Sequence, residues 1–261
     1  MISFIVPAHN EELWIGKCLG SIRTSMAAIA EPYEVIVVDD ASTDTTPRIA
    51  EQMGARAIRV EHRKISAVRN AGARAACGEV FIFVDADTQV NQQAVRAALS
   101  LLRSGAAGGA CVFEFDGVIP LWGRIIHRFG VTLGRLLRLA GGCFLFCTRQ
   151  AFAATGGFSE HLHAGEDLAF VQALKKIGRF VVPKPTVVTS GRKLSVVGPW
   201  EVVMLLVRIA LRGPRYENEK TLDFLYGRRA QDCKRPVKAA RGPNQITGAD
   251  GDLQGRQSLH D

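Results

Sequence analysis

The feature of this sequence that most constrains its fold is a regular alternation of short apolar runs with helical or turn-rich segments. Apolar runs at 2–6, 33–38, 55–60 and 80–84 have the length of buried strands. Strand–helix alternation of this kind predicts an α/β fold with a mostly parallel mixed sheet and helices on both faces. At 261 residues, the chain is long enough for one large domain of this type.

Spacing and capping residues predict the other boundaries. The first helix is expected over 11–29, with Asn10 as its N-cap. Further strands are expected at 110–115, 143–147, 179–182 and 186–189, and further helices at 66–76, 91–103, 149–155, 167–177 and 197–212. From about residue 228 onward the chain is polar and poor in large apolar residues, so this tail is expected to be disordered.

The charge of the chain favours an anionic partner without identifying it. A net charge of +8 suits a nucleotide, a phospholipid surface or a nucleic acid. Nucleic acid is not expected, because no recognition module accompanies the charge.

The six cysteines are expected to be reduced thiols, because none forms a Cys-x-x-Cys pair. A zinc site at Cys143 and Cys147 is the alternative, and it lacks a second pair of ligands.

The chain shows no secretory signal at its start and no apolar run of the ~18–20 residues that span a bilayer. A cytoplasmic protein is therefore expected. Segments 117–139 and 197–212 combine apolar residues with Arg, which suits core helices or helices that lie on a membrane. Peripheral contact with the inner face of the membrane is left open.

Two acidic clusters stand directly after expected strands. Asp39 and Asp40 end one strand, and Asp85-Ala86-Asp87 ends another. Open α/β sheets bind ligands at the carboxyl ends of their strands, so both clusters are expected at the ligand edge. Carboxylates gathered in a poorly solvated cleft repel one another, and a divalent cation with phosphate ligands removes that repulsion. The alternative is that these residues only form turns and cap helices.

Three nucleotide-binding or hydrolytic motifs are missing. The loop after the first strand, 7–12, reads Pro-Ala-His-Asn-Glu-Glu and lacks the Gly-x-Gly-x-x-Gly of dinucleotide-binding domains. The sequence contains neither a P-loop nor a Gly-x-Ser-x-Gly elbow. These absences count against a dinucleotide-dependent enzyme, a P-loop ATPase and an α/β-hydrolase.

Six motifs in order give a specific resemblance. They are Ile5-Val6-Pro7-Ala8-His9-Asn10-Glu11, Val37-Val38-Asp39-Asp40-Ala41-Ser42-Thr43-Asp44, Arg69-Asn70-Ala71-Gly72, Phe83-Val84-Asp85-Ala86-Asp87, Gly156-Gly157-Phe158 and Gly165-Glu166-Asp167. With them, the chain resembles the family 2 glycosyltransferases of the GT-A fold over about residues 1–195. The resemblance implies one Rossmann-like domain with a nucleotide-sugar-binding half (1–105), an acceptor-binding half with the catalytic base and C-terminal helices (106–227), and a flexible basic tail (228–261).

The resemblance also implies roles for individual residues. The residues implied around the donor nucleotide are Pro7, Ala8, Glu11, Asp39, Asp40, Arg69, Asn70, Asp85 and Ala86. Asp87, with Asp85 beside it, is implied as the ligand of a divalent Mg or Mn ion. Asp167 is implied as the general base, with Glu166 as its neighbour. Arg192 and Lys193 are expected to contact the diphosphate, and His163 the metal or the acceptor; solvated surface charges and a structural His are the alternatives.

The implied reaction is inverting transfer of a sugar from a nucleoside-diphosphate sugar, with UDP as the expected nucleotide. The acceptor is a hydroxyl, with a lipid or a polysaccharide of the cell envelope as hypotheses. A nucleotidyltransferase is the alternative among enzymes, and the loop at 7–12 is not Gly-rich as such enzymes require. A non-catalytic nucleotide-binding or membrane-associated module is the other alternative, and Asp87 and Asp167 count against it.

Overall fold

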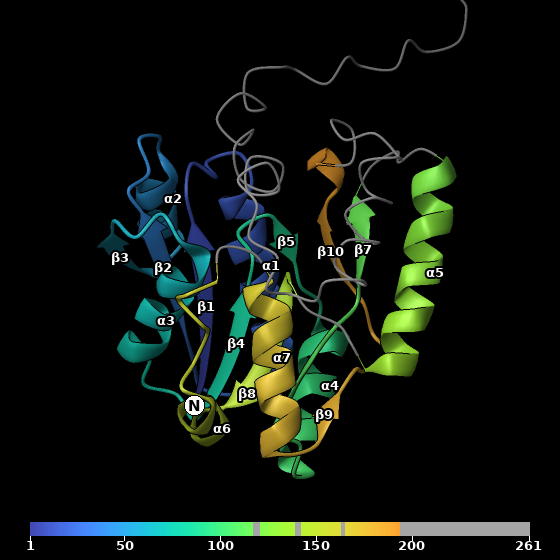
Figure 1. Ribbon diagram of the computed structural model, residues 1–261. Coiled ribbons are helices and arrows are strands. Elements are labelled where there is room, and N and C mark those ends of the chain that lie inside the picture. Colours follow the sequence, from blue (N-terminus) through green and yellow to red (C-terminus); the bar gives the residue numbers. More distant parts are fainter. Residues whose placement is uncertain (117–120, 139–141, 163–164, 194–261) are drawn as a thin grey trace, which may run out of the picture.

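The computed structural model describes residues 1–116, 121–138, 142–162 and 165–193 (Figure 1). The first half of the chain contains β1 (Ile2–Ala8), α1 (Ile15–Ile29), β2 (Tyr33–Asp40), α2 (Thr46–Gln52), β3 (Arg56–Val60), α3 (Ile65–Ala75), β4 (Val80–Val84), β5 (Thr88–Gln89) and α4 (Gln92–Arg103). The second half contains β6 (Gly108–Ala110), β7 (Phe113–Asp116), α5 (Leu121–Leu137), β8 (Phe144–Thr148), α6 (Arg149–Thr155), α7 (Glu166–Ile177), β9 (Phe180–Val181), β10 (Val187–Ser190) and the short 3-10 helix η1 (Gly191–Lys193).

The strands form two sheets. Within the described ranges, seven strands make the main sheet, in the order β3-β2-β1-β4-β8-β6-β9, and β5, β10 and β7 make a small second sheet. In the main sheet β8 runs antiparallel to both of its neighbours, and the other pairs are parallel. The prediction of a single α/β domain with a mostly parallel mixed sheet is therefore confirmed.

The main sheet is covered on both faces, which is why its central strands β4 and β8 are nearly continuous apolar runs. Side chains along β1 alternate between the two sides of the sheet. Phe4 and Val6 belong to the cluster that α1 and α4 complete, whereas Ile5 belongs to the cluster that α3 and α7 complete. Figure 1 shows α7 crossing in front of the sheet. The two layers hold the carboxyl ends of the strands in fixed positions.

Gly72 lies where α3 packs closely on the main sheet. A Cβ atom at this position would come within 2.4 Å of Ile5 Cγ2 and 2.8 Å of Val38 Cγ2. We expect Gly72→Ala to lower the free energy of unfolding by about 1–3 kcal/mol, because overpacking forces side chains or backbone to shift. Gly16→Ala in α1 is the matched control, since a Cβ atom there meets Ile49 Cγ2 at 3.7 Å, an ordinary contact. Urea unfolding measures the free energy of unfolding of both variants. An equal loss of stability in Gly16→Ala and Gly72→Ala would contradict the packing argument.

The loop between β1 and α1 differs from the prediction. The helix expected from Glu11 begins at Ile15, so Asn10 is not its N-cap. Asn10 has a positive φ of 53°, and its side-chain oxygen accepts a hydrogen bond from the Thr43 amide at 2.8 Å. The Glu11 amide donates to the Thr46 hydroxyl at 2.8 Å. Contacts with the loop after β2 satisfy these groups and hold the segment out of the helix.

The single strand predicted at 110–115 is two strands in two sheets. β6 lies in the main sheet and β7 in the small one. The Cys111 amide still donates to the carbonyl of Phe144 in β8 at 3.1 Å, whereas the Val112 carbonyl accepts from the Val187 amide in β10 at 3.1 Å. The chain therefore changes sheets between Cys111 and Val112. Hydrophobicity could not show this change, because the apolar run of residues 110–113 continues across it without a break.

Several predictions concern the rest of the chain. Segments 197–212 and 228–261 lie outside the described residues. Five of the six cysteines lie within the described residues. All five are free thiols, including Cys143 and Cys147. None of the helices in the described ranges is long and apolar enough to cross a membrane.

Candidate active site

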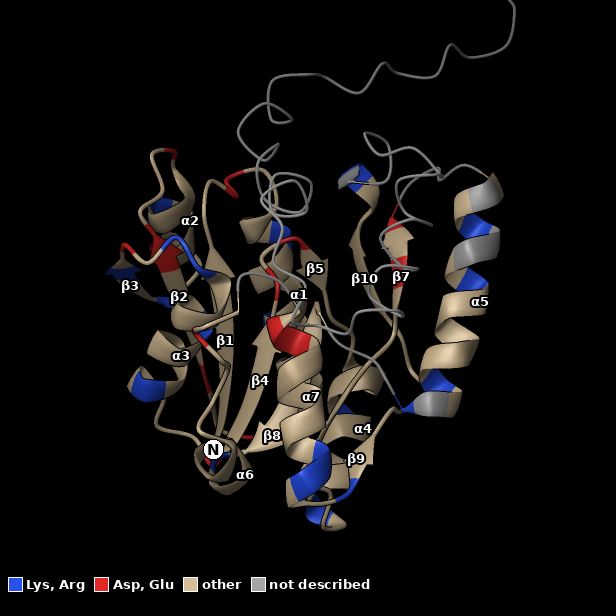
Figure 2. Cartoon of the chain, in the orientation of Figure 1, with Lys and Arg blue, Asp and Glu red and all other residues tan. Residues whose placement is uncertain are grey.

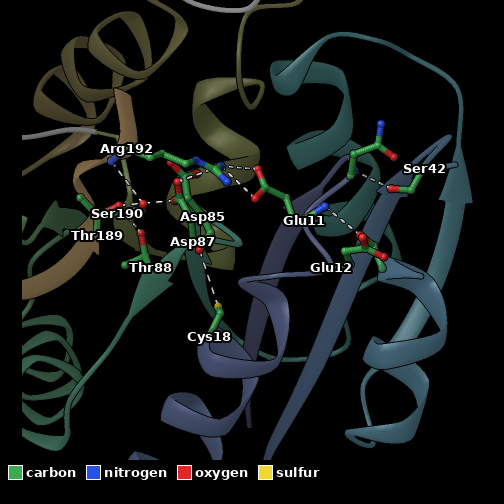
Figure 3. Close-up of polar contacts among 12 residues, drawn as sticks. Glu11, Glu12, Cys18, Ser42, Asp85, Asp87, Thr88, Thr189, Ser190 and Arg192 are labelled. Carbon is green, nitrogen blue, oxygen red and sulfur yellow. Dashed lines mark hydrogen bonds and ion pairs between the residues drawn. The ribbon is translucent and has the colours of Figure 1, made fainter. Parts of the chain in front are cut away.

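The strand order places the candidate site at one edge of the main sheet. β1 has β2 on one side and β4 on the other, so the chain leaves these strands in opposite directions. Such a reversal forms a crevice at the carboxyl ends of the strands, where α/β proteins bind ligands. The loop after β1 carries Glu11, and the turn after β4 carries Asp85 and Asp87 (Figure 3). Three of the acids predicted from the sequence, Glu11, Asp85 and Asp87, therefore lie at the switch point of the sheet.

Arg192 joins the two sides of this crevice. Its Nη2 atom donates to the two carboxylate oxygens of Glu11 at 2.7 and 2.8 Å, and it lies 3.2 Å from Oδ2 of Asp87. The guanidinium carbon stands 5.6 Å from the ring centroid of Trp14. Figure 3 shows Arg192, Glu11 and Asp87 pointing toward one another from η1, the β1 loop and the β4 turn. The predicted basic loop thus reaches the acidic crevice.

The small sheet fixes the position of Asp87. Thr88 and Thr189, paired across β5 and β10, are linked by a hydrogen bond between their hydroxyls at 3.0 Å. The Thr189 hydroxyl also donates to Oδ1 of Asp87 at 3.4 Å. At the start of η1, the Gly191 amide donates to Oδ1 of Asp116 at 2.9 Å. These contacts attach the acid and the neighbouring arginine to the same small sheet.

A second arginine, Arg69 of α3, is only 1% exposed and lies among three carboxylates. Its Nη2 atom donates to Oδ1 of Asp85 at 2.9 Å. Its Nη1 atom donates to Asp167 and lies 3.4 Å from Oε1 of Glu166. We call these four residues the Arg69 cluster. The Phe158 ring covers it, with its centroid 5.2 Å from the guanidinium carbon. The cluster connects the end of β4 to the start of α7.

The charge of the Arg69 cluster is unbalanced, because one guanidinium faces three carboxylates. Burial raises the pKa of Asp167 to about 7; the charges of Glu166 and Asp85 act in the same direction, and Arg69 opposes them. The pKa of Arg69 is also raised, although burial acts to lower it, because the carboxylates stabilise its charge. The side chain of Asp167 is 22% exposed. Asp167 can therefore exchange a proton near neutral pH.

The start of α7 sets the direction of these carboxylates. Glu166 and Asp167 occupy the first turn, where the helix dipole favours negative charge. Gly165 precedes them with a φ of 77°, a conformation that glycine adopts without steric cost. Figure 2 shows the acids as the red segment at one end of α7 and basic residues at the other end. An acidic first turn is common in helices, but contact with a buried arginine is not explained by the dipole.

Asp39 and Asp40 end β2 and have different partners. Oδ1 of Asp40 accepts hydrogen bonds from the backbone amides of residues 62–63 at 2.7 and 3.1 Å. Oδ1 of Asp39 accepts from the Ser42 amide at 3.3 Å. Its Oδ2 atom is buried, has Arg59 at 4.0 Å, and has no hydrogen-bond partner within the described residues. Asp39 therefore retains capacity to accept a hydrogen bond at this edge, whereas Asp40 organises the loop after β3.

Asn70 lies beside the site and holds its frame. Its amide nitrogen donates to the Phe158 carbonyl at 2.9 Å and to Oε1 of Glu160 at 2.8 Å, and its oxygen accepts from the Phe158 amide at 2.9 Å. These contacts tie α3 to the loop before α7. The predicted contact of Asn70 with the nucleotide stays a prediction, and the observed bonds belong to the scaffold.

The remaining predicted residues are less informative. The side chains of Pro7, Ala8 and Ala86 are buried. His163 and the side chain of Lys193 lie outside the described part of the chain.

Trp14 and Thr189 were missed by sequence reasoning. Trp14 stands just after two acids in the loop that follows the first strand, which is a signal that could have been used. Thr189 gives no such signal.

The acids of the turn after β4 suit a hard divalent cation. They would supply only part of its coordination, and a bound molecule would supply the rest. Asp85 and Asp87 lie two residues apart and supply carboxylate oxygens, and Mg²⁺ binds through one or two carboxylates together with phosphate oxygens. No group of three or more His, Cys, Asp or Glu side chains that could hold a metal occurs among the residues described. A cation at this turn would therefore take its further ligands from water or a bound phosphate.

Comparison with known proteins reveals relatives of this chain. A family profile described as Glycosyl transferase family 2 matches residues 3–152. Glycosyltransferase AglE from Haloferax volcanii is 27% identical in an alignment of 190 residues that covers 68% of this chain and 62% of that protein. The succinoglycan biosynthesis protein ExoO from Rhizobium meliloti is 30% identical in an alignment of 149 residues that covers 55% of this chain and 41% of that protein. The chain thus spans less than two thirds of the length of either relative.

Solved structures share the fold. The mannosyltransferase PcManGT from Pyrobaculum calidifontis, in complex with GDP-Man and Mn²⁺, aligns with a TM-score of 0.60 at 20% identity over 90% of this chain and 76% of that one. TarS from S. aureus, in complex with UDP-GlcNAc, aligns with a TM-score of 0.58 at 21% identity over 88% of this chain and 73% of that one. At these identities the likeness establishes the GT-A fold alone.

The family profile covers more than half of the chain, and its span includes Glu11, Arg69 and the acidic turn after β4. The resemblance found in the sequence is thereby confirmed. This chain belongs to glycosyl transferase family 2.

Proposed function

We propose that this protein moves a sugar from a nucleoside-diphosphate sugar, with UDP as the nucleotide, to an acceptor hydroxyl with inversion at the anomeric carbon. The Arg69 cluster carries the proposal, because it links Asp85 on the donor side of the crevice to Asp167 on the acceptor side. The structures of PcManGT with GDP-Man and of TarS with UDP-GlcNAc support a nucleotide-sugar donor.

The donor side of the crevice has groups that suit a diphosphate. Asp87 and Asp85 would hold a Mg or Mn ion, which when bound offsets charge on the leaving diphosphate. The Mn²⁺ in the PcManGT complex supports this assignment. Arg192 stands at the same crevice, and a guanidinium binds phosphate through paired donors. Oδ2 of Asp39 offers an acceptor for a donor group of the base or ribose.

The acceptor side has a carboxylate suited to general-base catalysis. As the acceptor oxygen bonds to the anomeric carbon, a carboxylate oxygen of Asp167 takes the hydroxyl proton. The bond from that carbon to the diphosphate breaks on the opposite face, so one displacement inverts the configuration. A pKa of about 7 matches Asp167 to this task at neutral pH. Arg69 holds the carboxylate in place.

The acceptor that we propose is a hydroxyl on a lipid-linked molecule or a polysaccharide of the cell envelope. The proposed place of action is the cytoplasm, with peripheral contact at the inner face of the membrane. The support for that contact is α5, which exposes several large apolar side chains and carries arginines.

Thermal unfolding with UDP, GDP or TDP, each with and without Mn²⁺, tests the donor half of the proposal. We expect UDP with Mn²⁺ to raise Tm by roughly 5–10 °C at a hundredfold excess over Kd, because a ligand that binds only the folded state stabilises it. UDP or Mn²⁺ alone should give a much smaller shift, since phosphate oxygens complete the coordination of the ion. A larger rise in Tm with GDP than with UDP would make GDP the nucleotide of the donor. The same rise in Tm with UDP in the absence of Mn²⁺ would contradict the metal site.

A further inference from the structure

The outer face of α5 presents a row of large apolar side chains to solvent. Leu121, Phe129 and Leu136 are 71%, 70% and 78% exposed, and Leu133 is 40% exposed. Steps of three, four and eight residues bring these positions to one side of a helix. We call these four residues the α5 row. Single exposed apolar residues are ordinary, but a contiguous exposed group marks an interaction surface.

The other side of α5 is attached to the protein. The His127 ring has its centroid 5.4 Å from that of Phe113 and 5.0 Å from that of Phe115, both on β7. Near the end of the helix, Arg135 donates to the Lys184 carbonyl at 2.8 Å. Figure 1 shows α5 standing at the side of the molecule, next to β7. These contacts fix the helix with the α5 row turned away from β7.

A basic groove adjoins the C-terminal end of α5. The groove has a volume of about 530 Å³ and lies between α4, the end of α5 and residues 179–185. Among the described residues, its charged lining consists of Arg135, Arg138, Arg179 and Lys184, without an acidic side chain. Four cations around one groove repel one another, so the groove suits an anionic group. Arg side chains bind phosphate through paired donors.

Further arginines lie along α5 itself. Arg124 and Arg128 are exposed and, with Arg135, fall on one flank of the helix beside the α5 row. The sequence of α5 contains neither Asp nor Glu. Figure 2 shows blue segments along α5 and around β9, and no red on α5. An apolar row with a purely basic flank is the pattern of a helix that lies in the interface of an anionic membrane.

We propose that the α5 row and the basic groove dock this protein onto an anionic phospholipid surface. The apolar side chains would enter the boundary between headgroups and acyl chains, while the cations bind lipid phosphates at headgroup level. A soluble phosphate alone would leave the apolar row uncovered. A second copy in a two-fold contact would bring the two arginine flanks together, which their charge opposes. The inference specifies the membrane contact within the proposed function and is independent of the catalytic step.

Cosedimentation of the full chain with vesicles tests this inference. We expect binding to mixed phosphatidylglycerol–phosphatidylcholine vesicles and little binding to pure phosphatidylcholine. Phe129→Ser/Leu136→Ser should lower the partition coefficient by roughly 100-fold or more, because two large apolar side chains no longer insert. Arg138→Gln/Lys184→Gln should lower it by about 30-fold, as expected for two basic residues near the surface.

A matched control separates docking from net charge. Arg23→Gln/Arg48→Gln removes two exposed charges from α1 and α2 and should leave vesicle binding nearly unchanged. If this control loses as much vesicle binding as Arg138→Gln/Lys184→Gln, the net charge of the protein and not the docking surface accounts for binding. Failure of the parent to bind anionic vesicles would also overturn the docking surface. So would binding that inorganic phosphate abolishes and the Phe129→Ser/Leu136→Ser variant retains, because the groove would then be a site for a soluble anion.

Two further measurements keep this inference distinct from the proposed transferase activity. Each variant should retain the parent Tm, because the substituted side chains are exposed. Each should also retain stabilisation by UDP with Mn²⁺, since none of them contacts the crevice. Loss of vesicle binding with retained nucleotide response supports the docking surface. Vesicle binding without any nucleotide response would contradict the proposed function and leave the docking surface in place.

Discussion

Asp167→Asn is expected to lower the rate of sugar transfer by about 10²- to 10⁴-fold, the usual contribution of a general base. The amide has nearly the same size as the carboxylate and can still accept a hydrogen bond from Arg69, but it cannot take a proton. Asp85 and Glu166 still balance the buried guanidinium, so the fold should be retained. Steady-state kinetics should show a fall in kcat with little change in the KM for the donor. Unchanged turnover would eliminate Asp167 as the base.

The pH profile of the parent provides a second measure of the same residue. Below its pKa, Asp167 is protonated and cannot act as a base, so kcat should rise with pH through about 7, the value to which burial raises this pKa. Asp167→Asn should lose this step. The matched control is Glu166→Gln, which should keep most of the turnover. It should also move the step to lower pH, because the charge of Glu166 raises the pKa of Asp167. A larger loss in Glu166→Gln than in Asp167→Asn would assign the base to Glu166.

Asp87→Asn is expected to abolish metal-dependent stabilisation by UDP and to lower transfer by about 10²- to 10³-fold. An amide oxygen is a neutral and weaker ligand for a hard cation than a carboxylate. Arg192 keeps its two bonds to Glu11 in this variant, so η1 should remain in place. Thermal unfolding with UDP and Mn²⁺, together with kcat, measures both effects.

The control for Asp87→Asn is Glu51→Gln, which removes one negative charge from the exposed surface of α2. It should leave the nucleotide response and the turnover unchanged. If Asp87→Asn binds UDP and Mn²⁺ as well as the parent, Asp87 is not the metal ligand. If both variants lose the response equally, net charge rather than coordination accounts for it.

Strand and helix positions could be predicted where one physical signal dominates. The strand predicted at 80–84 and the helix predicted at 149–155 match the structure residue for residue. Burial on both faces defines the strand, and a clear residue boundary at each end defines the helix. The strand expected at 110–115 is divided because its two halves pair with different partners. The helix expected from Glu11 starts later because polar contacts between two loops compete with helix formation.

The candidate site was predictable only in part. The acids that end β2 and those that follow β4 could be placed at one edge, because parallel strands bring their carboxyl ends together. Their partners could not be predicted, since Glu11 and Arg192 are 181 residues apart and Arg69 and Asp167 are 98 apart. Contacts over such separations depend on how helices pack on the sheet, and one sequence does not show the direction of a side chain.

The Arg69 cluster also bears on how far this protein can be divided. A fragment of residues 1–152, about the span that the family profile matches, would keep Asp85 but would lose Glu166 and Asp167. Arg69 would then keep one of its three carboxylate partners, and breaking a buried ion pair costs about 3–5 kcal/mol. The fragment would also lack Phe158, which packs edge-on against Phe83 with ring centroids 5.0 Å apart. We therefore expect residues 1–152 and the segment from Phe158 through α7 to fold as one unit, so that an exchange of segments between relatives would have to move Arg69 and the start of α7 together.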